Sequence, residues 1–440
     1  MSSTTSIFHR SLETTYPVAL SGDGVYLLTK SGQKILDGSS GAAVSSVGHG
    51  NQEVIDAIIH QTQALSFAHT SFFTSDPAEE LANFLITESG GPSIFSKVSF
   101  LCSGSEAVET ALKIARQYHV YRNEPERVNF IGREYSYHGN TLGALAAGNN
   151  PPRRAVFGPI LSQVFHHVSR CFYDADGEGR SEEEYEDALI QEFEDKVEQL
   201  GPKTVAAIIV EPVGGATLGA ATPTKTYLPR LRKLCDKHGI LLIFDEVMCG
   251  MGRCGNYHAW QGLGGVAPDL QTIGKGLGGG YLPLSAVLMG PKVYSVFEKG
   301  SKAGEKFTSG HTFQGHPVAC ASAIAVQRII KRDCLIPNVV KMGLRLRMLL
   351  ADGFPAELVE GGARVRGRGL FQSLDFGTAG TKLGGPLGAA VRDEAFRLGA
   401  AVYLCSSAVD AVLFAPPFII NAEEVGKLAD IVLTALRNSQ

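Results

Sequence analysis

The sequence lacks long hydrophobic runs and has no excess of either charge sign. Its longest weakly polar stretches, 317–326 and 411–420, are about half as long as a membrane span, so no transmembrane helix is expected. Lys and Arg number 40 and Asp and Glu number 44, which gives a formal charge of −4 without any block of like charges. This balance argues against nucleic acid or an anionic membrane as a partner, because both bind through clustered basic residues.

Paired cysteines and targeting segments are also missing. The eight cysteines form no CxxC pair, and the closest two, Cys249 and Cys254, have no His or Cys neighbours at metal-ligand spacing. We therefore expect reduced thiols and no metal site. The Ser- and Thr-rich N-terminus has no apolar segment typical of a secretion signal, so the expected location is the cytoplasm, with the mitochondrion as the alternative.

Glycine, in contrast, is abundant. The chain has 51 glycines among 440 residues, above the usual share of about 7%. They follow no collagen-like period and cluster between apolar runs. This pattern indicates loops that lie close to a bound group.

Four short apolar runs predict buried β-strands. Continuous rather than alternating hydrophobicity indicates strands covered on both faces, hence an α/β fold with a mostly parallel sheet and helices on either side. Apolar residues at helical spacing follow Ser105 and recur from Tyr227 to His238. The four predicted strands are 97–101, 127–131, 204–210 and 239–244.

The two ends of the chain have a different pattern of predicted secondary structure from this core. Residues 20–37 resemble two short antiparallel strands around a turn, and residues 355–420 mix short strands with helices. We predict a smaller α+β domain built from both chain ends. The predicted bounds are 1–50 for its N-terminal part, 51–315 for the large domain and 316–440 for its C-terminal part.

The residues that follow each predicted strand are the candidates for function, because ligands of open parallel sheets bind at the carboxyl ends of the strands. Gly104 and Ser105 follow the first strand and begin a helix, where backbone N–H groups favour a phosphate; an ordinary serine helix cap is the alternative. Tyr137 and Gly139 follow the second strand. An aromatic ring beside a glycine suits a planar ligand, although a plain surface loop would read the same way.

Two acidic residues follow the third and fourth strands. Glu211 and Asp245 both end buried apolar runs, and a buried carboxylate is costly unless a cation or hydrogen-bond donor pairs with it. A divalent metal and a protonated ring nitrogen both satisfy this requirement.

Lys275 separates the two alternatives. It lies between Gly274 and Gly276 and is followed by Gly278, Gly279 and Gly280. A solvated lysine does not need neighbours without side chains, whereas a lysine bonded to a planar cofactor does. The order GxxxxGK[ST] of a phosphate-binding loop is absent, so a nucleotide site is disfavoured.

Taken together, these motifs resemble those of the class III (omega-type) aminotransferases, pyridoxal-phosphate-dependent enzymes of fold type I, the aspartate-aminotransferase-like fold. The resemblance covers most of the chain. The matching segments are 36–58, 103–116, 137–145, 211–255, 268–287 and 310–326.

The resemblance implies pyridoxal 5'-phosphate (PLP) as cofactor. Lys275 would form the internal aldimine and carry the reacting proton, and Asp245 would bond the ring nitrogen. Tyr137 and Val247 resemble the residues on the two faces of the ring. The remaining implied cofactor residues are Gly104 and Ser105 at the phosphate, with Glu211 and His138 nearby.

The resemblance also implies a homodimer with shared active sites, in which Thr312 reaches the phosphate of the neighbouring protomer's cofactor. The partners would be small amine and carbonyl substrates. Many relatives hold a substrate carboxylate with an arginine that this chain lacks between Tyr403 and Phe414. Arg392 and Arg397 fall on a predicted helix and are expected at the surface.

Small residues replace a bulky aromatic at Ala42 and Ala43, and Ala43, Phe72 and Phe73 are the predicted substrate-lining residues. A wide pocket without a tightly held α-carboxylate follows from these departures. The predicted reaction is ping-pong transfer of an amino group from an amine or omega-amino donor to a ketone or aldehyde. A racemase or epimerase, an aminomutase or a decarboxylating transaminase would use the same lysine and aspartate, and a catalytically silent scaffold is a further alternative.

Overall fold

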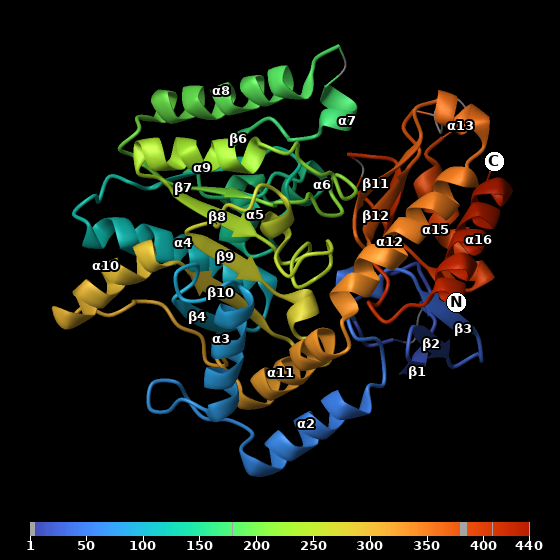
Figure 1. The fold of residues 1–440 in the computed structure, drawn as a ribbon, viewed down its shortest axis with the longest axis horizontal. Coiled ribbons are helices and arrows are strands. Elements are labelled where there is room, and N and C mark those ends of the chain that lie inside the picture. Colours follow the sequence, from blue (N-terminus) through green and yellow to red (C-terminus); the bar gives the residue numbers. More distant parts are fainter. Residues whose placement is uncertain (1–4, 178, 379–384, 407, 440) are drawn as a thin grey trace.

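The computed structural model describes residues 5–177, 179–378, 385–406 and 408–439. The predicted end segments 1–50 and 316–440 therefore each include a few residues outside the described part. Figure 1 shows two lobes: a large one, coloured mainly cyan to yellow, and a smaller one that combines blue and red segments from the two ends of the chain.

A seven-stranded sheet forms the centre of the large lobe, in the order β4-β10-β9-β8-β7-β5-β6. Strand β10 is antiparallel to both of its neighbours, and the five strands from β9 to β6 are parallel. The strands are β4 (Lys97–Leu101), β5 (Asn129–Arg133), β6 (Phe165–Val168), β7 (Val205–Val210), β8 (Leu241–Asp245), β9 (Leu270–Ile273) and β10 (Ser285–Met289). The predicted α/β fold and all four predicted strands are confirmed.

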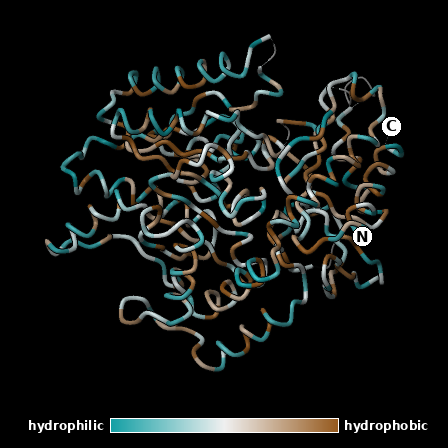
Figure 2. Tube along the Cα trace, in the orientation of Figure 1, coloured by the Kyte–Doolittle hydropathy of each residue, from teal (hydrophilic) through white to brown (hydrophobic). Residues whose placement is uncertain are grey.

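Helices cover both faces of this sheet. Alternate residues of β7 pack into different cores: Ile208 lies with the residues of α8 (Glu182–Leu200) and α9 (Tyr227–His238), and Ile209 lies with those of α4 (Gly104–Tyr121). Figure 2 shows the strands as mainly hydrophobic and the outermost helix, α8, as mainly hydrophilic. Burial on both faces explains why the strands are continuously apolar in the sequence.

The other helical elements of the large lobe connect the strands and extend its edges. They are α1 (Ser40–Ala43), α2 (Gln52–Ala64), α3 (Asp76–Glu88), α5 (Leu142–Ala147), α6 (Pro151–Arg154), η1 (Gly158–Ile160), α7 (Tyr173–Asp176), η2 (Ala259–Gly262), η3 (Lys275–Leu277), α10 (Pro291–Lys302) and α11 (Pro317–Arg332).

The small lobe contains two four-stranded sheets. Their orders are β1-β2-β3-β13 and β11-β12-β15-β14. The strands are β1 (Ala19–Asp23), β2 (Tyr26–Thr29), β3 (Lys34–Asp37), β11 (Arg364–Arg368), β12 (Phe371–Asp375), β13 (Ala400–Ala401), β14 (Tyr403–Leu404) and β15 (Ala411–Phe414). Its helices are α12 (Leu335–Asp352), α13 (Ala356–Glu360), α15 (Leu387–Leu398) and α16 (Ala422–Asn438).

The pairing of β3 with β13 joins the two ends of the chain in one parallel ladder. The prediction of two strands within 20–37 was wrong in number, because the run from Lys34 forms a third strand that pairs with β2 on one side and with β13 on the other. Helix α11 packs against α2 and α3 and contributes residues to the cores of both lobes. The domain bounds at 50/51 and 315/316 stay a prediction.

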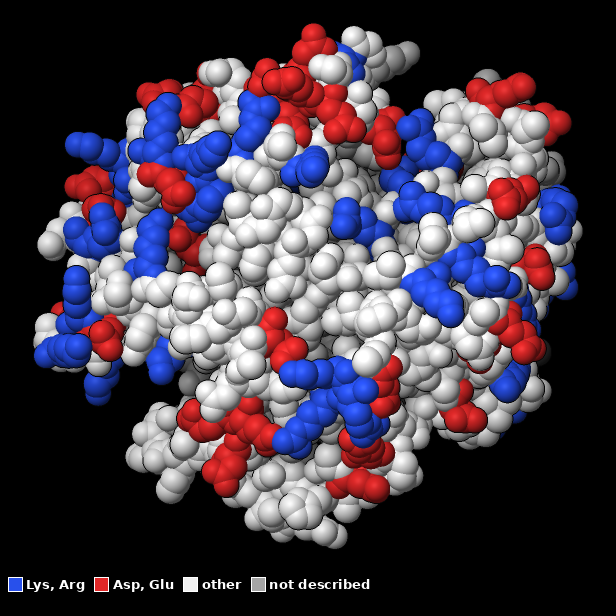
Figure 3. Space-filling model, viewed as in Figure 1, with Lys and Arg blue, Asp and Glu red and all other residues white. Residues whose placement is uncertain are grey.

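The surface carries charges of both signs. On the face shown in Figure 3, acidic and basic side chains are interspersed around the edges of a mostly uncharged centre. Within the described ranges, none of the helices is both long enough and apolar enough to cross a membrane.

Candidate active site

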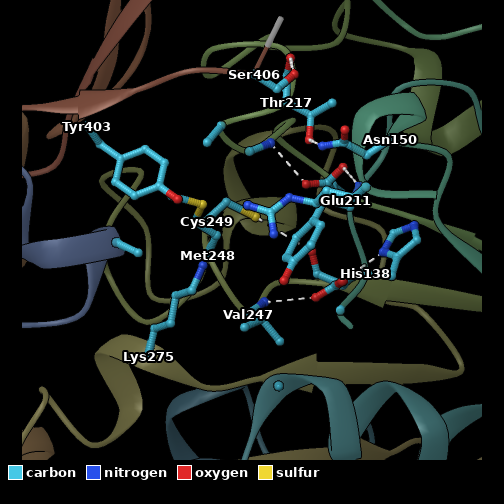
Figure 4. Close-up of a pocket in the computed structure, with 18 of the residues that line it drawn as sticks. His138, Asn150, Glu211, Thr217, Val247, Met248, Cys249, Lys275, Tyr403 and Ser406 are labelled. Atoms are coloured by element: carbon cyan, nitrogen blue, oxygen red, sulfur yellow. Dashed lines mark hydrogen bonds and ion pairs between the residues drawn. The ribbon is translucent and has the colours of Figure 1, made fainter. Parts of the chain in front are cut away.

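One pocket of about 370 Å³ lies where the strand ends of the large lobe meet the small lobe. Glu211 follows β7, Asp245 ends β8 and Lys275 follows β9, so three neighbouring parallel strands deliver charged groups to one place. The small lobe closes the other side with Tyr403 and the residues up to Ser406. Figure 4 shows Lys275 extending into the pocket on the side opposite His138.

The backbone turn at Lys275 is held by hydrogen bonds, whereas its side-chain amine has no acidic partner among the described residues. Its φ angle of 45° lies in the left-handed region, which is unusual for a residue other than glycine. The amide of Gln327 on α11 holds this turn by donating to the carbonyls of Gly276 (3.0 Å) and Leu277 (2.9 Å). Among the described residues, no acidic side chain forms an ion pair with the lysine. Burial lowers the pKa of Lys275 to about 8, although Asp245 opposes that shift.

The carboxylate of Asp245 is held by three donors. His138 Nδ1 lies 2.7 Å from Oδ2, and Oδ1 accepts from the backbone N–H of Val247 (3.1 Å) and the hydroxyl of Thr272 (3.0 Å). An ionised carboxylate only accepts hydrogen bonds, so this contact with ionised Asp245 requires a proton on Nδ1 of His138. Both side chains are buried, so little water screens the charge of the carboxylate, and its electrostatic interaction with a neighbouring charge is strong.

Glu211 is also buried, and burial raises its pKa. Its side chain accepts from the backbone N–H groups of Gly215 (2.9 Å) and Tyr137 (3.3 Å). The latter bond ties the loop that carries the Tyr137 ring to the end of β7. Val247 lines the pocket as well, close to Gly104.

Gly104 and Ser105 begin α4 at the pocket wall. The cap of this helix is Ser103, whose hydroxyl accepts from the N–H of Glu106 (3.2 Å). Ser103 is therefore an ordinary helix cap, and the next two residues, in the first turn of α4, line the pocket. Their role at a phosphate stays a prediction. Ser105 Oγ accepts from the N–H of Asn140 at 3.0 Å, which leaves its hydroxyl hydrogen available for a ligand.

Four predicted site residues lie elsewhere in a single protomer. Ala43 is buried in the core, whereas Ala42 lines the pocket. The predicted lining residue is therefore shifted by one position. The backbone of α1 is irregular here, and Ala43 has a φ angle of 65°. Phe72 and Phe73 are 80% and 66% exposed, and Thr312 is exposed too; none of these three lines the pocket. Arg392 and Arg397 are on α15, where Arg397 is exposed and Arg392 is half-buried; neither lines the pocket.

The glycines of the pocket differ in how tightly protein atoms surround them. A Cβ at Gly274 or Gly276 would meet its nearest protein neighbour at 3.4 Å, an ordinary contact. A Cβ at Gly104 would lie 2.7 Å from Val247 Cγ1, and one at Gly139 would lie 2.6 Å from Ser105 Oγ. Protein packing therefore requires glycine at Gly104 and Gly139, whereas the clearance of Gly274 and Gly276 for a bound group stays a prediction.

Comparisons with known proteins agree with this geometry. The aminotransferase class-III family matches residues 8–436. An uncharacterized aminotransferase of Schizosaccharomyces pombe is 40% identical over 96% of this chain and 93% of its own length. The crystal structure of an amine transaminase from an uncultivated Pseudomonas species, in the PLP-bound form, is 32% identical with a TM-score of 0.91 and covers all of both chains. An (S)-enantioselective omega-transaminase of Thermomicrobium roseum is 33% identical with a TM-score of 0.89, covering 98% of this chain and 96% of its own.

The chain belongs to the class III aminotransferases. Enzymes of this family depend on PLP, and the fold and family predictions are confirmed. The transaminase interpretation is supported over the racemase, mutase and decarboxylase alternatives.

The pocket of this class III aminotransferase suits a phosphorylated aromatic aldehyde. Gly104 packs so closely on Val247 that a side chain would fill the space, and the helix start beside it offers N–H donors. Lys275 supplies an amine without an ion-pair partner, and the buried Nε2 of His138 has no hydrogen-bond partner among the described residues. The donor set thus fits PLP.

Several pocket residues of the class III aminotransferase escaped the sequence analysis. They come from loops and short elements without a strand signal, and tertiary packing alone brings them together. They are Arg10, Asn150, Arg153, Val213, Gly215, Ala216, Thr217, Met248, Cys249, Tyr403, Leu404, Cys405 and Ser406.

Proposed function

We propose that this transaminase moves an amino group from an amine or omega-amino donor to a ketone or aldehyde acceptor in a ping-pong reaction, with Lys275 as the residue that bonds to PLP. The observation that carries the proposal is the unpaired Lys275 amine inside the pocket, opposite the Asp245–His138 pair. A pKa of about 8 leaves a useful share of this amine neutral, and only the neutral amine is nucleophilic.

Bound PLP supplies an electron sink for the reacting carbon of the substrate. The residues of the chain supply the rest. Asp245, oriented by His138, Val247 and Thr272, stabilises a positive charge on a ring nitrogen. Lys275 removes and returns a proton at the substrate carbon, a role that typically contributes about 10²- to 10⁴-fold to the rate.

Positioning is the task of the remaining site residues. We assign the phosphate to the α4 start at Gly104 and Ser105, and the two faces of the ring to Tyr137 and Val247. Glu211 holds the Tyr137 loop through the 3.3 Å bond to its backbone N–H.

A homodimer with shared active sites accounts for the predicted residues that lie outside the pocket. Phe72 and Phe73 are strongly exposed, and so is Phe313, next to Thr312. Exposed aromatic side chains of this kind are typical of interface cores. Sedimentation velocity should give a dimer, and Thr312→Val should release PLP faster from that dimer; a monomer with full activity would contradict the shared site.

The cytoplasm stays the proposed location. All eight cysteines are free, and six of them are buried, as suits a reducing compartment. Fractionation of the cells that make the protein checks this assignment.

The decisive experiment for the reaction type uses the holoenzyme, a panel of amines and no acceptor. A transaminase converts its bound cofactor to the amino form once and stops until a carbonyl compound is added. Absorbance spectra follow this conversion. A racemase would return to the starting spectrum while the amine changed configuration, and that result would overturn the proposal.

A further inference from the structure

The pocket contains two arginines that none of the roles above uses. Arg153 lies in the last turn of the short helix α6, and Arg10 comes from the N-terminal segment. They lie far apart in the sequence and meet only at this pocket.

Arg153 lies beside the ring of Tyr137. Its guanidinium carbon is 5.0 Å from the ring centroid, within cation–π distance, and its side chain is partly buried. In the described part of the chain, the guanidinium groups of Arg153 and Arg10 have no ion-pair or hydrogen-bond partner. Burial raises the pKa of Tyr137 and the charges of Arg153 and Arg10 both oppose that rise, which places both charges near its hydroxyl.

The acidic groups of the pocket do not neutralise these arginines. Asp245 is bonded to His138, Val247 and Thr272. Glu211 accepts from two backbone N–H groups. A guanidinium that is partly withdrawn from water and lacks a carboxylate partner favours an anionic ligand.

The described C-terminal part of the small lobe brings no cation to the pocket. Its contribution to the pocket wall is Tyr403, Leu404, Cys405 and Ser406. Arg366 on β11 does not line the pocket, and it is bonded to Asp375 and to the carbonyls of Gly219 and Leu218. The positive charge that the sequence lacks between Tyr403 and Phe414 is instead present at Arg153 of the large lobe and at Arg10 of the N-terminal segment.

We propose that Arg153, assisted by Arg10, binds a carboxylate of the carbonyl substrate, which makes oxo acids the preferred acceptors of this enzyme. The proposal rests on the transaminase function above and revises the expectation of a substrate without a held carboxylate. The planar guanidinium can donate two parallel hydrogen bonds to a carboxylate, and this pairing is stronger than one with a neutral group. The start of α4 serves a separate anion, the phosphate.

The test compares two four-carbon aldehydes as acceptors, 4-oxobutanoate, which ends in a carboxylate, and butanal, which ends in a methyl group. Each is mixed with the amino form of the holoenzyme, and the return of the cofactor spectrum gives kcat/KM for the half-reaction. For Arg153→Met we expect kcat/KM to fall about 10- to 100-fold with 4-oxobutanoate, and less than about threefold with butanal. Arg10→Met should show the same selectivity with a smaller effect.

Arg154→Met is the matched control, because Arg154 is the next residue of α6 and does not line the pocket. It should leave both acceptors unchanged. Arg153→Lys keeps the charge but loses the paired donors, so it should recover part of the loss with 4-oxobutanoate. Binding of the unreactive butanoate ion to the holoenzyme, measured by calorimetry, should weaken in Arg153→Met to the same degree.

Three outcomes would overturn the proposal. The first is an equal loss with both acceptors, which would make Arg153 a positioning residue for Tyr137. The second is faster release of PLP from Arg153→Met, which would assign the arginine to the cofactor phosphate. The third is a wild-type enzyme that does not prefer 4-oxobutanoate to butanal. Failure of the transaminase function itself would look different, since no amine would convert the wild-type holoenzyme.

Discussion

The Nδ1 atom of His138 lies 2.7 Å from Oδ2 of Asp245, and both side chains are buried at the end of β8. The second carboxylate oxygen is held by Val247 and Thr272. The carboxylate therefore has one orientation, set by three separate segments of the chain. A carboxylate held in this way can stabilise a positive charge that develops during the reaction, because the side chain does not have to reorient first.

Replacement of the carboxylate by an amide tests this role. Asp245→Asn keeps the shape of the side chain but removes its charge, so we expect kcat to fall by about 10²- to 10³-fold while part of the PLP stays bound. Steady-state kinetics and the cofactor content of the purified variant measure the two effects. The exposed Asp430→Asn on α16 is the control. A kcat within a few-fold of wild type would show that Asp245 carries no catalytic charge.

The pH dependence of PLP incorporation tests the environment of Lys275. The amine loses its proton as pH rises, so the rate of incorporation into apoprotein should increase up to the pKa of about 8 and level off above it. At one unit below the pKa about a tenth of the amine is neutral, and at one unit above it about nine-tenths. The reaction of N-acetyl-lysine with PLP is the reference. A rate that keeps rising through pH 10, as the reference does, would contradict the shifted pKa.

The glycine at the start of α4 is predicted to be essential for cofactor retention. An alanine at Gly104 would place its Cβ 2.7 Å from Val247 Cγ1, so Val247, which lines the pocket, must shift. Overpacking of this kind costs about 1–3 kcal/mol, which corresponds to roughly 10- to 100-fold weaker PLP binding. Gly274→Ala, with its nearest contact at 3.4 Å, should change the affinity by less than about threefold. Dilution of the holoenzyme and fluorescence of released PLP give both values, and equal effects would refute the assignment.

Stability depends on a second buried acid, which the proposed reaction does not use. Glu246 is fully buried and accepts from the backbone N–H groups of Ala259 (2.7 Å) and Trp260 (2.9 Å). In Glu246→Gln one of these N–H groups would face an amide NH₂, so we expect a loss of about 1–3 kcal/mol in the free energy of unfolding.

Urea unfolding of the holoenzyme measures this change, and the exposed Glu134→Gln is the control. Unchanged stability of Glu246→Gln would mean that the two backbone groups find other acceptors.

Much of the fold follows from local sequence. The strands β7 and β8 read as continuous apolar runs because both faces are covered, and α4 and α9 show the helical period. Strands β9 and β10 were not predicted. They are short and flank the lysine segment, and their strand conformation depends on pairing with each other and with β8 and β4.

The charged site residues could be predicted where the local sequence carries a signal. Asp245 ends a continuous apolar run and Lys275 is flanked by glycines, and the structure brings both into the pocket. Arg153 has no such signal, because its local sequence does not distinguish it from the neighbouring Arg154. Only the packing of α6 beside Tyr137 distinguishes the two arginines. Thr312 is exposed and does not line the pocket of the single protomer, so the fold of one chain gives it no place at the site.

The most direct test of the central claim is to identify the lysine that bonds to PLP. The holoenzyme is reduced with borohydride, digested and analysed by mass spectrometry. We predict that the phosphopyridoxyl group is on the peptide that contains Lys275, and that Lys275→Ala carries no label and has no transaminase activity. A label on another lysine, or turnover by Lys275→Ala, would contradict the assignment of this pocket as the active site.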